Sequence, residues 1–409
     1  MKRRALGLIA AVALSSSAHA AWITSWSAAP VNPMGAMGPF PATPTYSNVT
    51  FRQTLRLSAG GKALRIRFSN AYGSQPLAIG AARVALLDAA GQEIAGSSRT
   101  IRFADAGEAK VARGAPLVSD PVPLAVPPLA RVAVSFYLPG ETGPCTCHQT
   151  GLDDTAISAP GNHVAEAFAP AQHSQSRAFL AGVEVDAAGP ARTVAIMGDS
   201  ISDGVGSTSG ANRRWPDRLA ERLAGRGGPG WGVANQGISG NRVLADGMGE
   251  SALARFDRDI LGLPGVSAVI LFEGVNDLGM SFGNFEGAMG QAMASMRGKP
   301  ITADDIIAGY TQIAERAHAH GIRLYGATIA PYQGASYWTP AGEAARQKIN
   351  AFIRTSKVFD AVVDFDAVFR DPAQPAQMRA DYHMGDHLHG NDASYRAVGD
   401  SIPLDLFKR

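Results

Sequence analysis

A serine, a carboxylate and an imidazole occur in this chain at positions that suit nucleophilic catalysis. Ser200 follows a short apolar run, in Gly198-Asp199-Ser200, and at the mouth of a helix its hydroxyl would lie beside backbone N–H groups that stabilise negative charge. Near the C-terminus, Asp386 and His389 are three residues apart. On a turn or helix start, that spacing lets the carboxylate fix the imidazole tautomer, so that the other ring nitrogen can take the serine proton. Taken alone, Ser200 is better explained as a helix N-cap. The other segments change that interpretation.

Two of these segments place hydrogen-bond donors near the same hydroxyl. The run 235–241, Asn-Gln-Gly-Ile-Ser-Gly-Asn, follows an apolar stretch, and Gly240 lets the backbone approach a ligand with its N–H pointing inward. Gly274-Val275-Asn276-Asp277 follows another apolar run, and Asn276 offers a neutral amide donor. Ligands of an open α/β sheet bind at the carboxyl ends of the strands, where both segments are expected.

The elements that must hold these residues alternate between strand and helix from about residue 189 onward. Apolar runs bounded by turn residues predict strands buried on both faces, at 193–197, around Val233, and at 268–272, 323–329 and 361–365. Amphipathic patterns and capping residues predict helices at 213–223 and 302–320, from Thr339-Pro340 and from Asn391. This alternation predicts an α/β domain with a doubly wound parallel sheet and helices on both faces.

The first half of the chain has a different pattern. Apolar and polar residues alternate over 64–68 and 132–138, with glycine-containing turns between the runs, which predicts strands with one buried face. We predict a β-rich accessory domain of the β-sandwich or jelly-roll type over 21–186 and the α/β catalytic domain over 187–409.

The N-terminal residues 1–20 have the layout of a secretory signal peptide. A basic start, Met1 to Arg4, precedes a short apolar run and the small-residue pattern Ala18-His19-Ala20. The apolar run is too short to span a bilayer permanently. Every later stretch that is long enough to span a bilayer contains Gly, Pro or charge. We expect a mature protein that is secreted or periplasmic, with no stable membrane insertion.

Composition excludes some partners. The formal net charge is +2, and no run of Lys or Arg occurs beyond the first four residues, so a nucleic-acid partner is not expected. The two cysteines, Cys145 and Cys147, leave two alternatives open, a disulfide permitted by export or a pair of free thiols. A metal site there would need more ligands than His148 alone. Nothing in the sequence indicates the oligomeric state.

Together these motifs resemble the SGNH hydrolases, also called the GDSL esterase family. Four family blocks are matched in order across the second half, by Gly198-Asp199-Ser200-Ile201, Gly240, Gly274-x-Asn276-Asp277 and Asp386-x-x-His389. The resemblance implies that Ser200 is the nucleophile and that His389, oriented by Asp386, is the general base and then the general acid. It implies an oxyanion hole formed by the backbone N–H groups of Ser200 and Gly240 and the side chain of Asn276. The first half is similar to a β-rich extension found in some secreted bacterial members of the family. This similarity rests on residues 26–29 and 67–70.

Neighbouring residues have competing interpretations. A cluster of acidic residues and histidines near the C-terminus could bind a transition metal; it consists of Asp381, His383, Asp386, His387 and His389. Asp386 and His389 already have predicted catalytic roles. We therefore predict neither a metal nor a cofactor. A carboxylate pair among Asp203, Glu273 and Asp277 could support glycoside hydrolysis, but we favour turn stabilisation and helix capping. Asp199, Tyr337 and Trp338 are predicted to contact substrate, and loop packing suits the two aromatic residues equally well.

The sequence therefore predicts a serine esterase that works through an acyl-enzyme. Its expected partner is a small-molecule or polysaccharide ester with an acetyl or other short acyl group, on a carbohydrate or an aryl alcohol. The alternatives are a lipase or lysophospholipase-type acylhydrolase and a non-catalytic glycan-binding protein that uses the β-rich domain. That domain could instead simply cover the hydrolase and shape its cleft. The G-x-S-x-G motif of α/β-hydrolases is absent, which argues against that larger fold.

Overall fold

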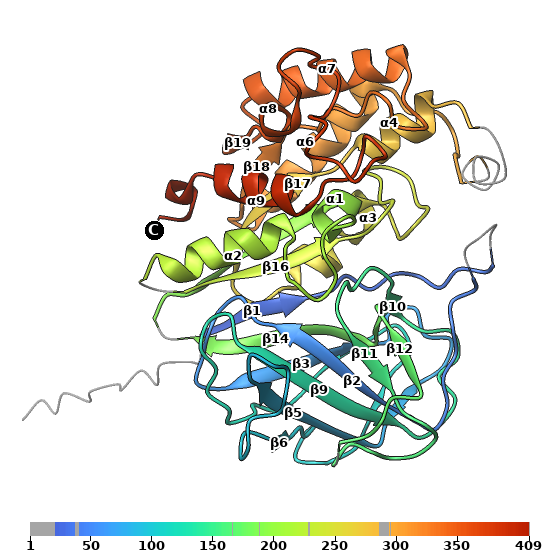
Figure 1. The fold of residues 1–409 in the computed structure, drawn as a ribbon, viewed down its shortest axis with the longest axis vertical. Helices are drawn as coiled ribbons and strands as arrows, with labels where there is room; N and C mark the ends of the chain where they lie inside the picture. Colours follow the sequence, from blue (N-terminus) through green and yellow to red (C-terminus); the bar gives the residue numbers. More distant parts are fainter. Residues whose placement is uncertain are drawn as a thin grey trace, which may run out of the picture.

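The chain folds into two parts that lie below and above a common interface in Figure 1. The computed structural model describes residues 21–36, 41–165, 167–187, 189–227, 230–285, 294 and 296–408. The predicted signal peptide, 1–20, lies outside the described residues. Strands up to Ala187 form antiparallel sheets, and a parallel sheet with helices begins at Arg192. The predicted fold class, a β-rich part followed by an α/β part with a doubly wound parallel sheet, is confirmed.

The first part consists of two antiparallel sheets that share one apolar core. Its strands are β1 Ala21–Ser27, β2 Val49–Arg56, β3 Leu64–Ser69, β4 Leu77–Ile79, β5 Ala81–Leu87, β6 Arg99–Thr100, β7 Ala109–Val111, β8 Pro116–Val118, β9 Arg131–Leu138, β10 Cys147–His148, β11 Thr155–Ile157, β12 Gln172–Ser174, β13 Arg177–Ala178 and β14 Leu180–Ala187. One sheet has the order β1-β14-β3-β8 and the other β12-β11-β2-β9-β5-β6, while β4–β7 and β10–β13 are separate pairs. Phe68 of the first sheet packs edge-on against Phe136 of the second, as expected for a sandwich.

The second part is built on a five-stranded parallel sheet of order β16-β15-β17-β18-β19. Its strands are β15 Arg192–Gly198, β16 Trp231–Gly237, β17 Val266–Phe272, β18 Arg323–Ala327 and β19 Ala361–Val363. From β15 the chain first adds β16 on one side and then crosses to add β17 on the other. The carboxyl end of β15 is therefore the switch point at which ligands bind in such sheets.

Helices connect the parallel strands. Those expected after Thr302, Thr339 and Asn391 begin at the predicted positions, and the helix expected over 213–223 covers 215–225. The helices are α1 Ser200–Asp203, α2 Trp215–Gly225, α3 Ala252–Phe256, α4 Val275–Phe282, α6 Ala303–Ala319, α7 Pro340–Thr355, α8 Phe365–Phe369 and α9 Asp392–Ser401, with a π turn at Asp257–Leu261 and a 3₁₀ turn at Leu404–Phe407. The side chains of Thr302, Thr339 and Asn391 accept hydrogen bonds from the first turns of α6, α7 and α9. No helix in the described ranges is both long and apolar enough to cross a bilayer.

Strand β1 lies along the junction between the two parts (Figure 1). The N–H of Thr24 donates to Thr193 Oγ1 at 3.0 Å, and Ser27 Oγ donates to the carbonyl of Asn235 at 3.2 Å. A Cβ at Gly232 would lie 2.0 Å from the carbonyl oxygen of Thr24, so β16 can approach β1 this closely only with glycine there.

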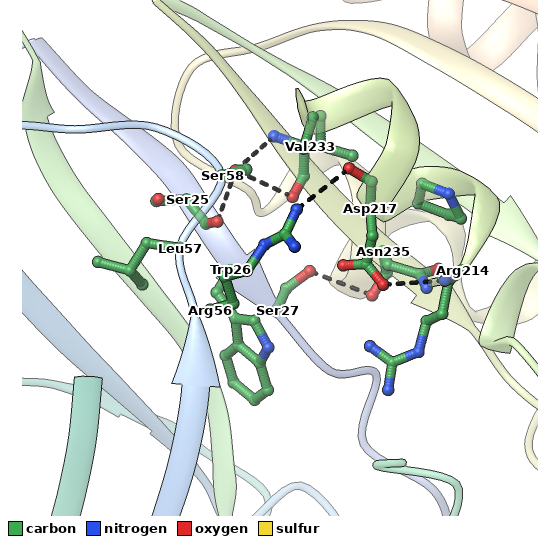
Figure 2. A pocket seen from close by; sticks show the side chains of 12 residues that line it. Ser25, Trp26, Ser27, Arg56, Leu57, Ser58, Arg214, Asp217, Val233 and Asn235 are labelled. Atoms are coloured by element: carbon green, nitrogen blue, oxygen red, sulfur yellow. Dashed lines mark hydrogen bonds between the residues drawn. The ribbon is translucent and has the colours of Figure 1, made fainter. Parts of the chain in front are cut away.

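Figure 2 shows a second region of this junction, around Arg56 and Ser58 at the end of β2. Ser58 Oγ donates to Ser25 O at 2.6 Å and accepts from Val233 N at 2.8 Å. Arg56 Nη2 forms an ion pair with Glu221 of α2, with an N–O distance of 2.9 Å. The cavity between these residues is about 30 Å³, which is room for a water molecule and not for an organic ligand. This face is a packed interface.

The two cysteines form a disulfide, Cys145–Cys147. Of the two alternatives left open by the sequence, the structure has the bridged one. The disulfide lies directly before His148, on a segment that reaches the second part of the chain.

Candidate active site

Ser200 lies at the carboxyl end of β15, as the first residue of the short helix α1. Asp199 is the N-cap of this helix, and its carboxylate accepts a hydrogen bond from the N–H of Ile201 at 2.9 Å. Gly204 ends the helix in the left-handed conformation, with φ of 101°, and its N–H donates to the carbonyl of Ser200 at 2.9 Å. These bonds fix Ser200, which is only 5% exposed.

The structure brings Ser200, His389 and Asp386 together in one hydrogen-bonded chain. Ser200 Oγ lies 2.8 Å from His389 Nε2, and His389 Nδ1 lies 2.6 Å from Asp386 Oδ2. Asp386 Oδ1 accepts the backbone N–H groups of Leu388 and His389, each at 3.0 Å. Because a carboxylate oxygen can only accept, His389 Nδ1 carries the proton in this arrangement. Nε2 is then the acceptor of the serine hydroxyl, as general-base catalysis requires.

The carboxylate of Asp386 is held in its ionised form. Its partial burial acts to raise the pKa, but the hydrogen bonds from the His389 ring and from the two backbone N–H groups outweigh that effect. The pKa of Asp386 therefore lies well below its usual range. A permanent negative charge beside Nδ1 stabilises the imidazolium that forms when His389 takes a proton.

The loop after β16 lies against the same edge of the sheet. The N–H of Ile238 donates to the carbonyl of Gly198 at 2.9 Å, which ties this loop to the strand end that carries Ser200. Asn276 Nδ2, from α4, donates to the carbonyl of Asn241 at 3.0 Å and so holds the loop from the other side.

Gly240 lies in this loop with φ of 78°, a conformation that favours glycine. Within the described residues, the backbone N–H groups of Ser200 and Gly240 have no hydrogen-bond acceptor. Such unpaired donors at a strand end can stabilise an anion. The structure therefore places all three predicted oxyanion donors at one edge, and their catalytic role stays a prediction.

A buried arginine that the sequence argument missed braces these loops from below. Arg255 of α3 is fully buried, and it donates to Asn241 Oδ1 at 3.0 Å, to Gln236 O at 2.7 Å and to Gly198 O at 3.3 Å. It thereby connects the ends of β15 and β16 with the loop that follows Gly240. The signal in the sequence was a lone charge in the apolar run Ala252–Phe256, although the run does not reveal the partners of that charge.

The acidic residues at this edge stabilise turns and caps rather than forming a carboxylate pair open to substrate. Asp277 Oδ2 accepts from Val243 N at 2.8 Å, and Asp203 Oδ2 accepts from Ser239 N at 3.0 Å. Burial raises the pKa of Asp199 to about 7 and that of Asp277 to about 6. Burial and the nearby Asp199 carboxylate raise the pKa of Glu273 well above its usual value, against the opposing effect of Arg255.

The residues predicted to contact substrate occupy supporting positions. Asp199 is buried and caps α1, and Tyr337 is buried with its ring 5.9 Å from that of Tyr332. The ring of Tyr337 also fills the space that a side chain at Gly279 would need, and Trp338 packs partly buried against the main core. Each has a structural role here, and its contact with substrate stays a prediction.

The histidines beside His389 are used within their own loop. His383 Nδ1 accepts the N–H groups of Gly385 at 3.1 Å and His387 at 3.3 Å, and the rings of His383 and His387 pack with centroids 4.3 Å apart. In the described part of the chain, no three His, Cys, Asp or Glu side chains converge as a metal site would require.

Comparison with known proteins finds a family match within the second half of the chain. Residues 196–397 match the GDSL-like Lipase/Acylhydrolase family, and the β-rich part lies outside the matched residues. No curated protein matches the chain.

Solved structures similar to this half include an aryl esterase from M. smegmatis (15% identity, covering 51% of this chain and 95% of that one, TM-score 0.38). A psychrotrophic esterase from Pseudoalteromonas sp. is similar at 17% identity, with coverage of 51% and 93% and a TM-score of 0.37. A GDSL-like lipase from Bacteroides thetaiotaomicron is similar at 20% identity, with coverage of 51% and 84% and a TM-score of 0.35.

Proposed function

The chain belongs to the GDSL-like lipase/acylhydrolase family through its residues 196–397, and from this premise we propose that it hydrolyses carboxylic esters through a covalent intermediate on Ser200. The observation that carries the proposal is the hydrogen-bonded chain from Ser200 Oγ through the His389 ring to Asp386. An unactivated serine hydroxyl is a weak nucleophile, and this arrangement supplies its base.

In the acylation step, Ser200 Oγ attacks the ester carbonyl carbon while its proton passes to His389 Nε2. The carbonyl oxygen becomes an oxyanion that the N–H groups of Ser200 and Gly240 and the Asn276 amide stabilise. The C–O bond to the alcohol then breaks, and the leaving oxygen takes the proton from His389. Ser200 is left acylated, and Asp386 remains ionised throughout.

The second step reverses these roles with water as the nucleophile. Water attacks the acyl carbon, its proton passes to His389 Nε2, and the same donors stabilise the second oxyanion. The bond to Ser200 Oγ then breaks, and Oγ recovers the proton from His389. The products are one alcohol and one carboxylic acid, and the steps require no redox partner.

The direct test is hydrolysis of p-nitrophenyl acetate by the wild type and by Ser200→Ala. We expect Ser200→Ala to lower kcat by at least about 10⁴-fold, because the nucleophile is lost while binding and the oxyanion donors remain. Ser209→Ala is the matched control, because Ser209 is an exposed serine of the loop after α1. Equal rates for the wild type and Ser200→Ala would refute the proposal.

We propose further that the enzyme acts outside the cytoplasm on esters with short acyl groups. The signal-peptide layout of residues 1–20 supports export, and the Cys145–Cys147 disulfide fits an oxidising compartment. The side chains of His389 and Asp386 are 19% and 39% exposed, so solvent reaches this part of the site.

A substrate panel tests this second proposal. We expect acetylated xylan and aryl acetates to be hydrolysed, with rates that fall as the acyl chain lengthens. Preferential hydrolysis of long-chain or phospholipid esters would contradict it and favour a lipase-type acylhydrolase. For export, the cultured cells are fractionated, and retention of the protein in the cytoplasm with residues 1–20 intact would contradict it.

A further inference from the structure

A histidine from the β-rich part contacts the last residue of α1, the helix that begins with Ser200. His148 of β10 is buried, and its Nε2 lies 2.9 Å from Asp203 Oδ1 while its Nδ1 lies 3.1 Å from the carbonyl oxygen of Ala29. The two ring nitrogens thus lie against oxygen atoms of both parts of the chain. The ring therefore clamps Asp203 to the backbone of the β-rich part.

Asp203 connects His148 to the loop that carries Gly240. It is the last residue of α1, three positions after Ser200, and its second oxygen accepts both Ser239 N at 3.0 Å and Ser239 Oγ at 2.7 Å. Ser239 directly precedes Gly240. One carboxylate thus connects the helix of the nucleophile, the loop of an oxyanion donor and the imidazole of His148.

The β-rich part contacts the same loop at two more points. Thr150 Oγ1 lies 2.9 Å from Ser239 Oγ. Ile238, on the other side of Ser239, packs with Ala29 and Val31 in a small apolar cluster. The loop is therefore held by side chains of the β-rich part at Ser239 and at the preceding residue, Ile238.

The segment that presents His148 is itself well anchored. The Cys145–Cys147 disulfide closes it just before the histidine, β10 pairs with β13, and the N–H of Val31 donates to the carbonyl of Cys147 at 3.1 Å. Such support suits a side chain whose task is to hold another element in place.

We infer that His148 is a positioning residue for ester hydrolysis: through Asp203 and Ser239 it holds the loop that aims the Gly240 N–H at the developing oxyanion. The inference rests on the proposed function, and it gives the β-rich part a task in the reaction itself. Small displacements of an oxyanion donor reduce transition-state stabilisation more than they reduce ground-state binding. The effect of losing His148 should therefore appear in kcat.

The test compares three variants with p-nitrophenyl acetate. Loss of one oxyanion donor costs about 10²- to 10³-fold, so misplacement of one by His148→Ala should lower kcat by about ten- to a hundredfold, with KM changed by less than about threefold. His148→Gln retains an N–H donor that can reach Asp203 and should recover most of this loss. Arg56→Ala is the matched control, because it removes an ion pair of the same interface at 2.9 Å that does not touch the loop, and its kcat should equal that of the wild type.

The outcomes separate the inference from the proposed function. Wild-type kcat in His148→Ala, or an equal loss in Arg56→Ala, would overturn the inference while leaving the esterase intact. An inactive wild type would overturn the proposed function instead. If His148→Ala fails to fold by circular dichroism, Ser239→Ala decides the matter, because it removes the side-chain bonds to Asp203 and Thr150 and leaves the interface packed. Ser239→Ala should lower kcat several-fold at unchanged KM, and full activity would refute the inference.

Discussion

The substitution Asp386→Asn tests the assignment of protons in the candidate active site. Asp386 Oδ1 accepts two backbone N–H groups, from Leu388 and His389, while Oδ2 faces the His389 ring at 2.6 Å. An amide at this position must keep its oxygen on the backbone N–H groups, which places its NH₂ group against Nδ1. Nδ1 must then accept, so the ring proton moves to Nε2 and faces the hydroxyl that it should deprotonate.

The expected cost follows from this reversed tautomer. In serine hydrolases with the same geometry, such a change lowers kcat by about 10⁴-fold, or about 5 kcal/mol of transition-state stabilisation. The fold should persist, because both backbone donors keep an acceptor. Steady-state hydrolysis of p-nitrophenyl acetate measures the loss, and thermal unfolding followed by circular dichroism verifies the fold.

A matched control lies in the same segment. Asp381→Asn neutralises an exposed carboxylate whose partner is Arg379, at 2.9 Å, and should leave kcat unchanged. If Asp386→Asn retains kcat within tenfold of the wild type, the proposed orientation of the His389 ring is wrong. An equal loss in Asp381→Asn would mean that charge in this segment, and not the tautomer, controls the rate.

Three further predictions concern the donors, the buried acid and metal dependence. Asn276→Ala should lower kcat for p-nitrophenyl acetate by about 10²- to 10³-fold with little change in unfolding temperature, and a loss of less than threefold would exclude its amide from the oxyanion hole. Because burial raises the pKa of Asp199 to about 7, the folded protein holds a proton between about pH 4 and 7 that the unfolded chain has released, so this group's contribution to stability falls as pH rises through that window. Asp199→Asn should therefore gain roughly 2–3 kcal/mol relative to the wild type between pH 5 and pH 8 in urea unfolding, and a pH-independent difference would contradict this. Dialysis against EDTA should leave esterase activity unchanged, and loss that added divalent metal restores would show that a metal takes part.

Much of the fold could be predicted from local pattern. Leu64, Ile66 and Phe68 are buried in β3 and alternate with less buried neighbours, as period two requires. The pattern was less reliable in β9, where Ala133 and Ser135 are also buried, because β9 lies between β2 and β5 inside its sheet.

Two predicted strands were too long, and the first of them, 323–329, ends as β18 at Ala327. The run 361–365 was expected to be extended throughout, but β19 ends at Val363 because Asp364 caps helix α8 and accepts from the N–H of Ala367. An aspartate three residues before the apolar pair Ala367-Val368 carries this signal, which strand periodicity hides.

The residues of the candidate site likewise fall into two groups, those that local motifs reveal and those that they do not. Ser200, Asp386 and His389 could be identified because their motifs are short and sequential, and a strand end fixes where they converge. His148 and Arg255 could not, because their partners lie on elements that only the tertiary fold brings together. His148 in particular belongs to a two-residue strand, and its contact with Asp203 spans 55 positions of the chain.

The central claim is that Ser200 is the nucleophile and His389 its base. The most direct measurement is reaction with a fluorophosphonate ester, followed by mass spectrometry of the tryptic peptides. We predict one phosphonyl group per chain, on Ser200, with no adduct in Ser200→Ala and much slower labelling in His389→Ala. Labelling at another residue, or undiminished labelling of Ser200→Ala, would contradict the account.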